Sequence, residues 1–130
     1  GAPEYIDKLK KTAAKTRIIH LPFVENKLLP QYFSAADIAI YPGDFTISVL
    51  EAMSCGLPVL TPYWFGSTYL EKSRGIVKFD RGNPVKLFRK ITSLAYNKNL
   101  IHKFGKLNRS YTENNLNWIK IANFVSKLVV

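Results

Sequence analysis

The residues best suited to chemistry lie between Gly43 and Glu51, in the segment Gly-Asp-Phe-Thr-Ile-Ser-Val-Leu-Glu. A glycine, an acidic residue and two hydroxyl side chains stand directly before an apolar helical stretch that carries a glutamate. A turn of this kind presents backbone N–H groups at the start of a helix, where phosphate groups bind. Glu51 falls one turn into that helix, and its carboxylate can accept hydrogen bonds from ribose hydroxyls. The pattern therefore predicts a site for a phosphorylated ligand that contains ribose.

Structural roles for the same side chains remain open at this point. Ser48 and Glu51 have the spacing of a capping box, with Ser48 as the N-cap and Glu51 three residues later. Such a cap contributes about 0.5–2 kcal/mol to helix stability without any ligand. Asp44 would repel a diphosphate, so it binds sugar hydroxyls, caps the helix or pairs with a lysine or arginine.

The elements around this turn alternate between helical and extended patterns. Strands separated by helices predict a parallel sheet, and hence an α/β fold of the Rossmann-like, doubly wound kind. Because the chain opens with a helix, we expect a domain that lacks its first strand or strands. We expect helices over residues 3–15, over 47–55 with a stop at Gly56, and over 66–72, with a further helix capped by Asn26 and several helices from residue 83 onward. We expect strands over residues 17–21, 37–41, 58–61 and 75–79.

Composition and charge narrow the function classes. The chain has 130 residues and 47% apolar residues, which is enough for the core of one domain. Cys55 is the single cysteine, so no internal disulfide forms, and His20 and His102 are isolated, which argues against a zinc site. Residues 71–109 hold eleven Lys/Arg against two acidic residues. Such a basic block indicates either an anionic partner or a solvated helical face.

Several motifs together resemble one known family. The segments Ala35-Ala36-Asp37, Leu50-Glu51-Ala52-Met53 and Cys55-Gly56-Leu57-Pro58-Val59 resemble the C-terminal, nucleotide-sugar-binding half of family 4 glycosyltransferases (glycosyl transferases group 1) with the GT-B fold. Phe23-Val24 resembles the family's upstream loop. One departure concerns the family's first glutamate, whose place is taken by Gly43, with Asp44 next to it.

The resemblance implies a single, partial donor-binding domain over residues 1–130, with a C-terminal helix over 113–130. It implies a retaining enzyme that moves a sugar from a UDP- or GDP-sugar to a glycan or lipid-linked acceptor in cell-surface polysaccharide synthesis. No metal or other cofactor is expected, and none of the site residues is a proton-transfer catalyst. The expected donor-binding residues are Val24, Gly43, Asp44, Phe45, Thr46, Ile47, Ser48 and Glu51.

The resemblance also implies partners and a location. The acceptor domain of the same protein is expected to be missing from this chain, which alone is expected to be inactive. The basic 71–109 block would hold the cytoplasmic enzyme to the anionic inner face of the cell membrane. The alternatives are a non-catalytic nucleotide-sugar-binding module, an RNA-binding α/β module and a sugar-nucleotide epimerase. Phe88, Phe104 and Trp118 have helical core spacing, which disfavours base stacking on RNA.

Overall fold

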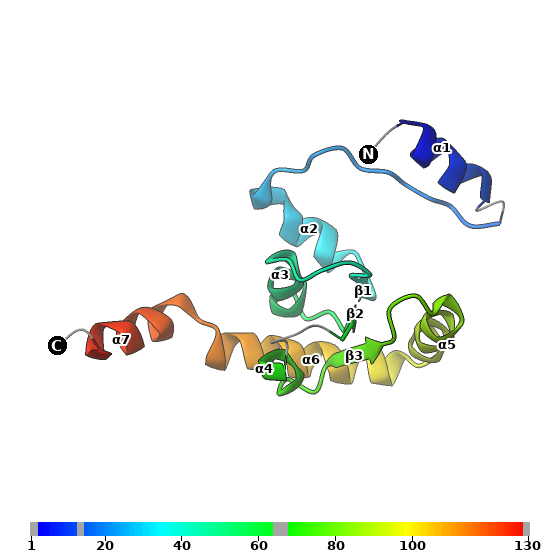
Figure 1. Cartoon of the computed structure of the whole chain (residues 1–130). Helices are drawn as coiled ribbons and strands as arrows, with labels where there is room; N and C mark the ends of the chain where they lie inside the picture. Colours follow the sequence, from blue (N-terminus) through cyan, green and yellow to red (C-terminus); the bar gives the residue numbers. More distant parts are fainter. Residues whose placement is uncertain (1–2, 13–14, 64–67, 129–130) are drawn as a thin grey trace.

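The computed structural model describes residues 3–12, 15–63 and 68–128 of the chain (Figure 1). Helices and strands alternate along most of this length, as the sequence predicts. In chain order the elements are α1 (Pro3–Thr12), the 3₁₀ helix η1 (Asn26–Leu28), α2 (Leu29–Ser34), β1 (Ala39–Ile40), α3 (Ser48–Ser54), β2 (Val59–Pro62), α4 (Thr68–Glu71), β3 (Ile76–Phe79), α5 (Pro84–Ala95), α6 (Lys98–Asn115) and α7 (Trp118–Leu128).

The three strands form a parallel sheet in the order β1-β2-β3. Val59 at the start of β2 is in register with Ala39 on one side and Ile76 on the other. The central strand β2 is buried at all four positions, as expected for a parallel strand covered on both faces. The structure confirms the predicted α/β fold with a parallel sheet.

Each face of the sheet has its own apolar core, because successive strand residues point to opposite faces. On one face Val59 packs with Met53 of α3 and with neighbouring apolar residues. On the other face Leu60 packs with Leu94 of α5 and with Phe79. Helix α6 supplies side chains to both cores. The sheet is therefore covered on both sides, which is the doubly wound arrangement.

Helix α3 ends in a glycine turn that helix α6 approaches closely. Gly56 has a positive φ of 81°, its N–H donates to Met53 O, and the Leu57 N–H donates to Ala52 O. These two hydrogen bonds make a Schellman motif, which confirms the predicted helix stop. Gly105 of α6 packs on this turn so tightly that an added Cβ would overlap the Gly56 carbonyl oxygen.

A buried asparagine on α6 joins the entrances of two strands. The Asn108 side chain is fully buried, and its amide donates to Leu57 O at 2.8 Å and to Gly75 O at 2.9 Å. Its carbonyl oxygen accepts a hydrogen bond from Ser73 Oγ at 2.7 Å. Every polar group of this side chain thus has a partner, as burial requires.

The strand predicted over 17–21 is wrong. These residues are extended but belong to no sheet, and Figure 1 shows them in the long segment that leads from α1 to α2, away from β1. Ile19 is 64% exposed. An apolar, β-branched run becomes a strand only where a neighbouring strand accepts its hydrogen bonds, and no described strand lies beside this one.

Two local predictions also differ from the structure. Asn26 does not cap a helix through its side chain, because it is itself the first residue of η1. Strand β1 is shorter than the predicted 37–41, and Ile40 is 38% exposed, so this strand is buried on one face only. β1 is an edge strand of the described sheet, which explains both differences. Gly66, in the predicted helix 66–72, lies outside the described residues.

The expectation that three aromatic residues are core side chains is only partly correct. Phe104 does pack in the core on the α5 side of the sheet. In contrast, Phe88 and Trp118 are 67% and 82% exposed. Helical spacing places a side chain on a face but does not determine whether another element covers that face. Helix α7 begins at Trp118, and residues 113–115 complete α6.

Candidate nucleotide-sugar site

Most of the predicted site residues lie in one loop and the helix that follows it. The loop leaves the carboxyl end of β1 at Tyr41 and enters α3 at Ser48. In parallel α/β sheets this edge is where ligands bind. Gly43, Asp44, Phe45, Thr46 and Ile47 are all exposed there, and Ser48 and Glu51 are half-buried.

One hydrogen bond holds the first turn of α3 against the end of β1, and a second joins two side chains at the start of that turn. The Tyr41 hydroxyl donates to Ser48 O at 2.7 Å, and the hydroxyls of Thr46 and Ser48 lie 2.7 Å apart. Burial raises the pKa of the Tyr41 hydroxyl, the hydrogen bond to Ser48 opposes the rise, and the charge of Glu51 adds to it. Tyr41 is therefore a neutral donor that holds the start of the helix in place.

The predicted capping box is wrong. The residue before α3 is Ile47, with helical φ and ψ angles and no side-chain cap, while Ser48 is the first helical residue. The Ser48 hydroxyl is engaged by Thr46 rather than by the helix N-terminus. Within the described part of the chain, the Glu51 carboxylate forms no hydrogen bond and no ion pair. The structural role considered for Glu51 is thus removed.

Asp44 forms an ion pair that the sequence left as one of three alternatives. Its Oδ1 lies 2.6 Å from Nη2 of Arg81, which also donates to Gly43 O at 3.3 Å. Arg81 is the second residue after β3, so the pair connects the loops that follow the two outer strands. Sequence reasoning missed Arg81. Its place just after the Gly75–Phe79 strand was the available signal, since carboxyl ends of parallel strands meet at one edge.

A small pocket of about 190 Å³ lies beside this ion pair. It is formed where the loop after β1 meets the loop after β3 and the first turns of α5. Arg81 of the ion pair lines one part of it, and apolar side chains form most of the rest. Its lining residues are Pro42, Phe79, Arg81, Gly82, Asn83, Pro84 and Leu87.

Val24 is the one predicted site residue that the structure does not bring into this group. It is half-buried and precedes η1 by two residues. Within the described residues, no hydrogen bond joins Val24 to the segment from Gly43 to Glu51. Its predicted contact with the base stays a prediction.

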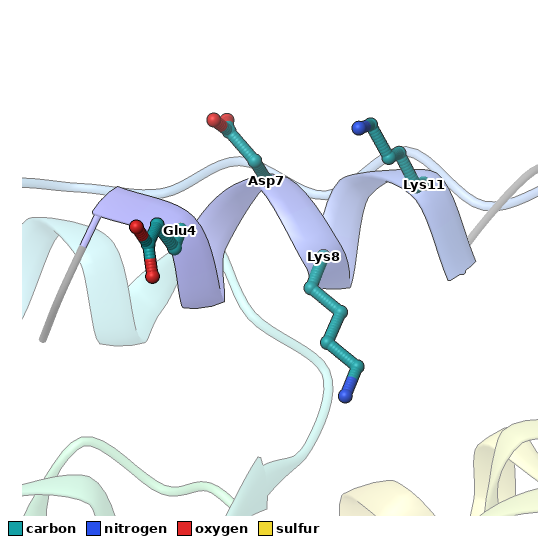
Figure 2. Close-up of a pocket in the computed structure, with 4 residues that line it drawn as sticks. All are labelled: Glu4, Asp7, Lys8 and Lys11. Carbon is teal, nitrogen blue, oxygen red and sulfur yellow. The ribbon is translucent and has the colours of Figure 1, made fainter.

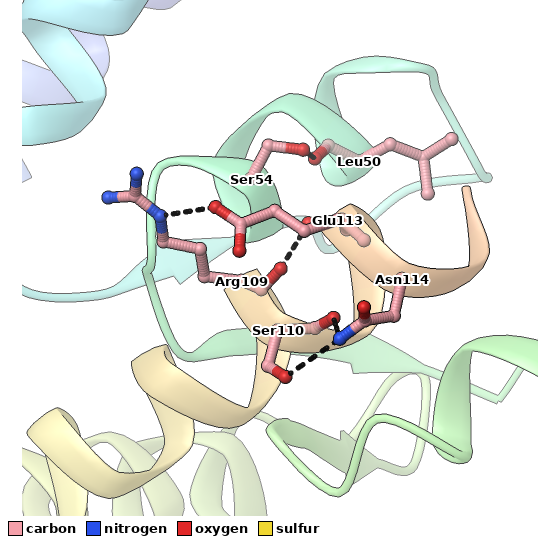
Figure 3. Close-up of polar contacts among 7 residues, drawn as sticks. Leu50, Ser54, Arg109, Ser110, Glu113 and Asn114 are labelled. Atoms are coloured by element: carbon pink, nitrogen blue, oxygen red, sulfur yellow. Dashed lines mark hydrogen bonds and ion pairs between the residues drawn. The ribbon is translucent and has the colours of Figure 1, made fainter. Parts of the chain in front are cut away.

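Two of the hollows that are larger than this pocket differ in their lining residues. The one on α1 is lined only by Glu4, Asp7, Lys8 and Lys11, which Figure 2 shows pointing in different directions from a single helix. The other lies where α3, the end of α6 and the start of α7 meet. Figure 3 shows the polar contacts near it. They stay within one helix each, as in the Arg109–Glu113 pair at 2.9 Å and the bond from Ser54 Oγ to Leu50 O.

These polar contacts stabilise helix ends and do not converge on a ligand position. Among the residues that the structure describes, no group of three or more His, Cys, Asp or Glu side chains is placed to hold a metal ion. In the same described ranges, no helix is long and apolar enough to cross a membrane. The loop after β1 with Glu51 is therefore the best candidate site.

A parallel sheet covered by helices on both faces, with a polar loop at its carboxyl edge, defines a Rossmann-like ligand-binding domain. The chain belongs to the family of glycosyl transferases group 1, whose family model matches residues 1–97. The fold is that of sucrose-phosphate synthase from Thermosynechococcus elongatus, at a TM-score of 0.83 and 21% sequence identity.

The match to that structure covers 97% of this chain and 33% of the other. The chain thus spans about a third of the length of the matched protein. A search of curated proteins gives no match. The family and the GT-B fold predicted from the sequence are confirmed.

Proposed function

We propose that the chain is the donor-binding domain of a retaining glycosyltransferase, and that its nucleotide-sugar binds at the loop after β1. The Glu51 carboxylate carries this proposal, because it belongs to a half-buried residue beside the loop and forms no hydrogen bond or ion pair with a described residue. Its oxygens can therefore accept hydrogen bonds from ligand donors. Ribose hydroxyls are such donors, and the adjacent start of α3 offers backbone N–H groups to the diphosphate.

The Arg81–Asp44 pair makes the loop compatible with an anionic ligand. Alone, the Asp44 carboxylate would repel a diphosphate. With Arg81 at 2.6 Å, the negative charge is offset locally and a guanidinium stands at the same edge. The Asp44 carboxylate keeps a second oxygen for a sugar hydroxyl, which would compensate for Gly43 at the place of the family's first glutamate.

The finer parts of the proposal follow from the family. The donor is a UDP- or GDP-sugar, Val24 contacts the base through its backbone, and the acceptor is a glycan or a lipid-linked glycan in cell-surface polysaccharide synthesis. The leaving diphosphate is stabilised by basic side chains and helix N-termini without a metal ion. The acceptor domain belongs to the same protein, and this chain alone binds the donor without transferring hexose. The enzyme acts on the cytoplasmic side of the membrane.

Titration with UDP, GDP and their sugar conjugates, followed by backbone amide NMR shifts, tests the proposal. We expect shifts centred on residues 43–51, with affinity unchanged by EDTA. Glu51→Gln should weaken binding at least about tenfold, because hydrogen bonds to a charged group are worth roughly 1.5–3 kcal/mol. The matched control is Glu113→Gln on α6, which should bind like the parent chain.

Two results would contradict the proposal. One is an unchanged affinity in the Glu51→Gln variant. The other is an absence of shifts at millimolar ligand, both in this chain and in a chain extended at its N-terminus, while the amide spectrum remains that of a folded protein.

A further inference from the structure

The pocket beside the Asp44–Arg81 pair offers hydrogen-bond donors from its side chains but no carboxylate. Among the described residues that line it, Arg81 carries the only charge, and Asn83 is the only other residue with a polar side chain. The Asn83 Oδ1 atom accepts a hydrogen bond from the Lys86 N–H at 3.0 Å, which leaves the Nδ2 group as a donor. A ligand that fits this pocket must therefore supply hydrogen-bond acceptors to these two side chains.

The Arg81 guanidinium is engaged at only one of its three nitrogen atoms. Its Nη2 donates to Asp44 Oδ1 at 2.6 Å and to Gly43 O at 3.3 Å. Its Nε and Nη1 form no hydrogen bond with a described residue, and the side chain is 56% exposed. Arg81 can therefore hold Asp44 through Nη2 and still donate to an anionic oxygen of a ligand through Nη1 or Nε.

The remaining walls of the pocket indicate which part of a nucleotide-sugar fits there. Pro42, Phe79 and Leu87 give it apolar walls, which suit the C–H groups of a sugar ring, whereas a diphosphate has no apolar surface to bury. Gly43 and Gly82 lie on the two loops that form the pocket, and an added Cβ at either would meet nothing within 4 Å. A ring can thus approach both loops without displacing a side chain at these two positions.

We propose that this pocket binds the carboxylate of a sugar acid, so that the donor is a nucleotide-linked hexuronic acid. The inference rests on the proposed function, which places the sugar at Gly43 and Asp44 and the diphosphate at the start of α3. Asp44 accepts a ring hydroxyl with its second oxygen, and Arg81 donates to the sugar carboxylate. Arg81 thereby also offsets the repulsion between that carboxylate and Asp44.

Isothermal titration calorimetry with two matched ligand pairs tests the proposal. The pairs are UDP-glucose with UDP-glucuronate and GDP-mannose with GDP-mannuronate, whose members differ only in having a hydroxymethyl or a carboxylate group on the ring. For the base that the chain accepts, we expect the acid to bind about fivefold more tightly, the effect of one ion pair at a partly exposed site. The backbone amide NMR signals of Gly82 and Asn83 should shift more with the acid than with the neutral sugar.

Substitutions in the ion pair should change this preference in opposite directions. Arg81→Gln should lower the affinity ratio of acid to neutral sugar to about one, with the affinity for UDP or GDP held within about twofold. Asp44→Asn should raise the ratio at least about twofold, because the guanidinium loses its competing carboxylate. Both substitutions break the pair, so a purely structural role of the pair would move the ratio in the same direction in both variants.

Arg89→Gln is the matched control for charge. Arg89 is an exposed cation of α5 that forms no ion pair with a described residue and does not line the pocket. Its replacement removes the same charge as Arg81→Gln, so the affinity ratio should stay that of the parent chain. Far-UV circular dichroism and the thermal midpoint verify that the three variants are folded, which is expected because the replaced side chains are exposed.

The possible failures of this inference differ from a failure of the proposed function. Equal affinity for acid and neutral sugars, in a chain that binds UDP or GDP, would overturn the sugar acid and leave the donor site in place. A loss of UDP or GDP affinity in Arg81→Gln as large as the loss for the acid would assign Arg81 to the diphosphate instead. An equal loss of preference in Arg89→Gln would show an effect of overall charge.

A fourth result would overturn both proposals together. It is the absence of binding of every nucleotide and nucleotide-sugar, in this chain and in a chain extended at its N-terminus, while the protein remains folded.

Discussion

Replacing Asn108 by alanine tests how the strands are held at their amino ends. The side chain makes hydrogen bonds with Leu57 O, Gly75 O and Ser73 Oγ, at 2.8, 2.9 and 2.7 Å. At a net value of about 1 kcal/mol each, their loss costs about 3 kcal/mol. Gly75 O keeps the Val59 N–H as a donor, but Leu57 O and the Ser73 hydroxyl proton lose their partner in a buried place, which adds roughly 1 kcal/mol or more. We therefore expect Asn108→Ala to lower the free energy of unfolding by about 4 kcal/mol.

Urea unfolding followed by circular dichroism measures this loss, and Asn114→Ala provides the control. Asn114 lies on the same helix but is exposed, and its amide bonds only to Ser110, at 2.8 Å to the carbonyl oxygen (Figure 3). Both variants gain the same helix propensity, so the difference between them reports the buried network. The control should change stability by less than about 0.5 kcal/mol. If the two variants agree within about 1 kcal/mol, the network does not hold β2 and β3 together.

Two further predictions concern packing and pH. Gly105→Ala should destabilise the protein by about 2–3 kcal/mol, because its methyl group would overlap the Gly56 carbonyl. Gly43→Ala is the control: its new Cβ meets nothing within 4 Å, so stability should hold within about 0.5 kcal/mol. Equal unfolding midpoints for the Gly105→Ala and Gly43→Ala variants would refute the close approach of Gly105 to Gly56. Tyr41→Phe should cost about 1 kcal/mol at neutral pH, because the hydrogen bond to Ser48 O is lost. Burial raises the Tyr41 pKa above its ordinary 10.0, so the contribution is complete below about pH 10 and declines as pH rises through the higher folded pKa. Unfolding curves of parent and variant should converge above pH 10, and a gap that widens there would contradict this assignment.

The sequence predicted those features whose causes are local. Gly56 followed by Pro58 predicts a helix stop with a left-handed residue, and the structure has one at Gly56. The alternation of apolar strands and helices predicts the parallel sheet. The prediction of a strand at 17–21 was wrong because its cause is not local. Extended residues become a strand only when a partner strand far away in the sequence pairs with them.

The candidate site was predictable in position but not in its contacts. The loop from Gly43 to Ser48 follows from a strand that ends before a helix. The pairing of Asp44 with Arg81 joins residues 37 positions apart, so it depends on the order of strands in the sheet, which local patterns do not give. Similarly, Ser48 has good capping chemistry, but its neighbour Thr46 engages its hydroxyl instead.

The order in which the chain is synthesised has a consequence for how the sheet is completed. Helix α6 closes the domain through residues that contact much earlier segments: Gly105 meets Gly56, and Asn108 reaches Leu57, 51 residues before it. A ribosome that adds about 5–20 residues per second needs roughly 3–10 s between the end of β2 and the end of α6. During that interval the strand entrances lack the side chain that bonds them. We therefore expect the sheet to acquire its final rigidity only after α6 has left the ribosome, and to be open to proteases and chaperones until then.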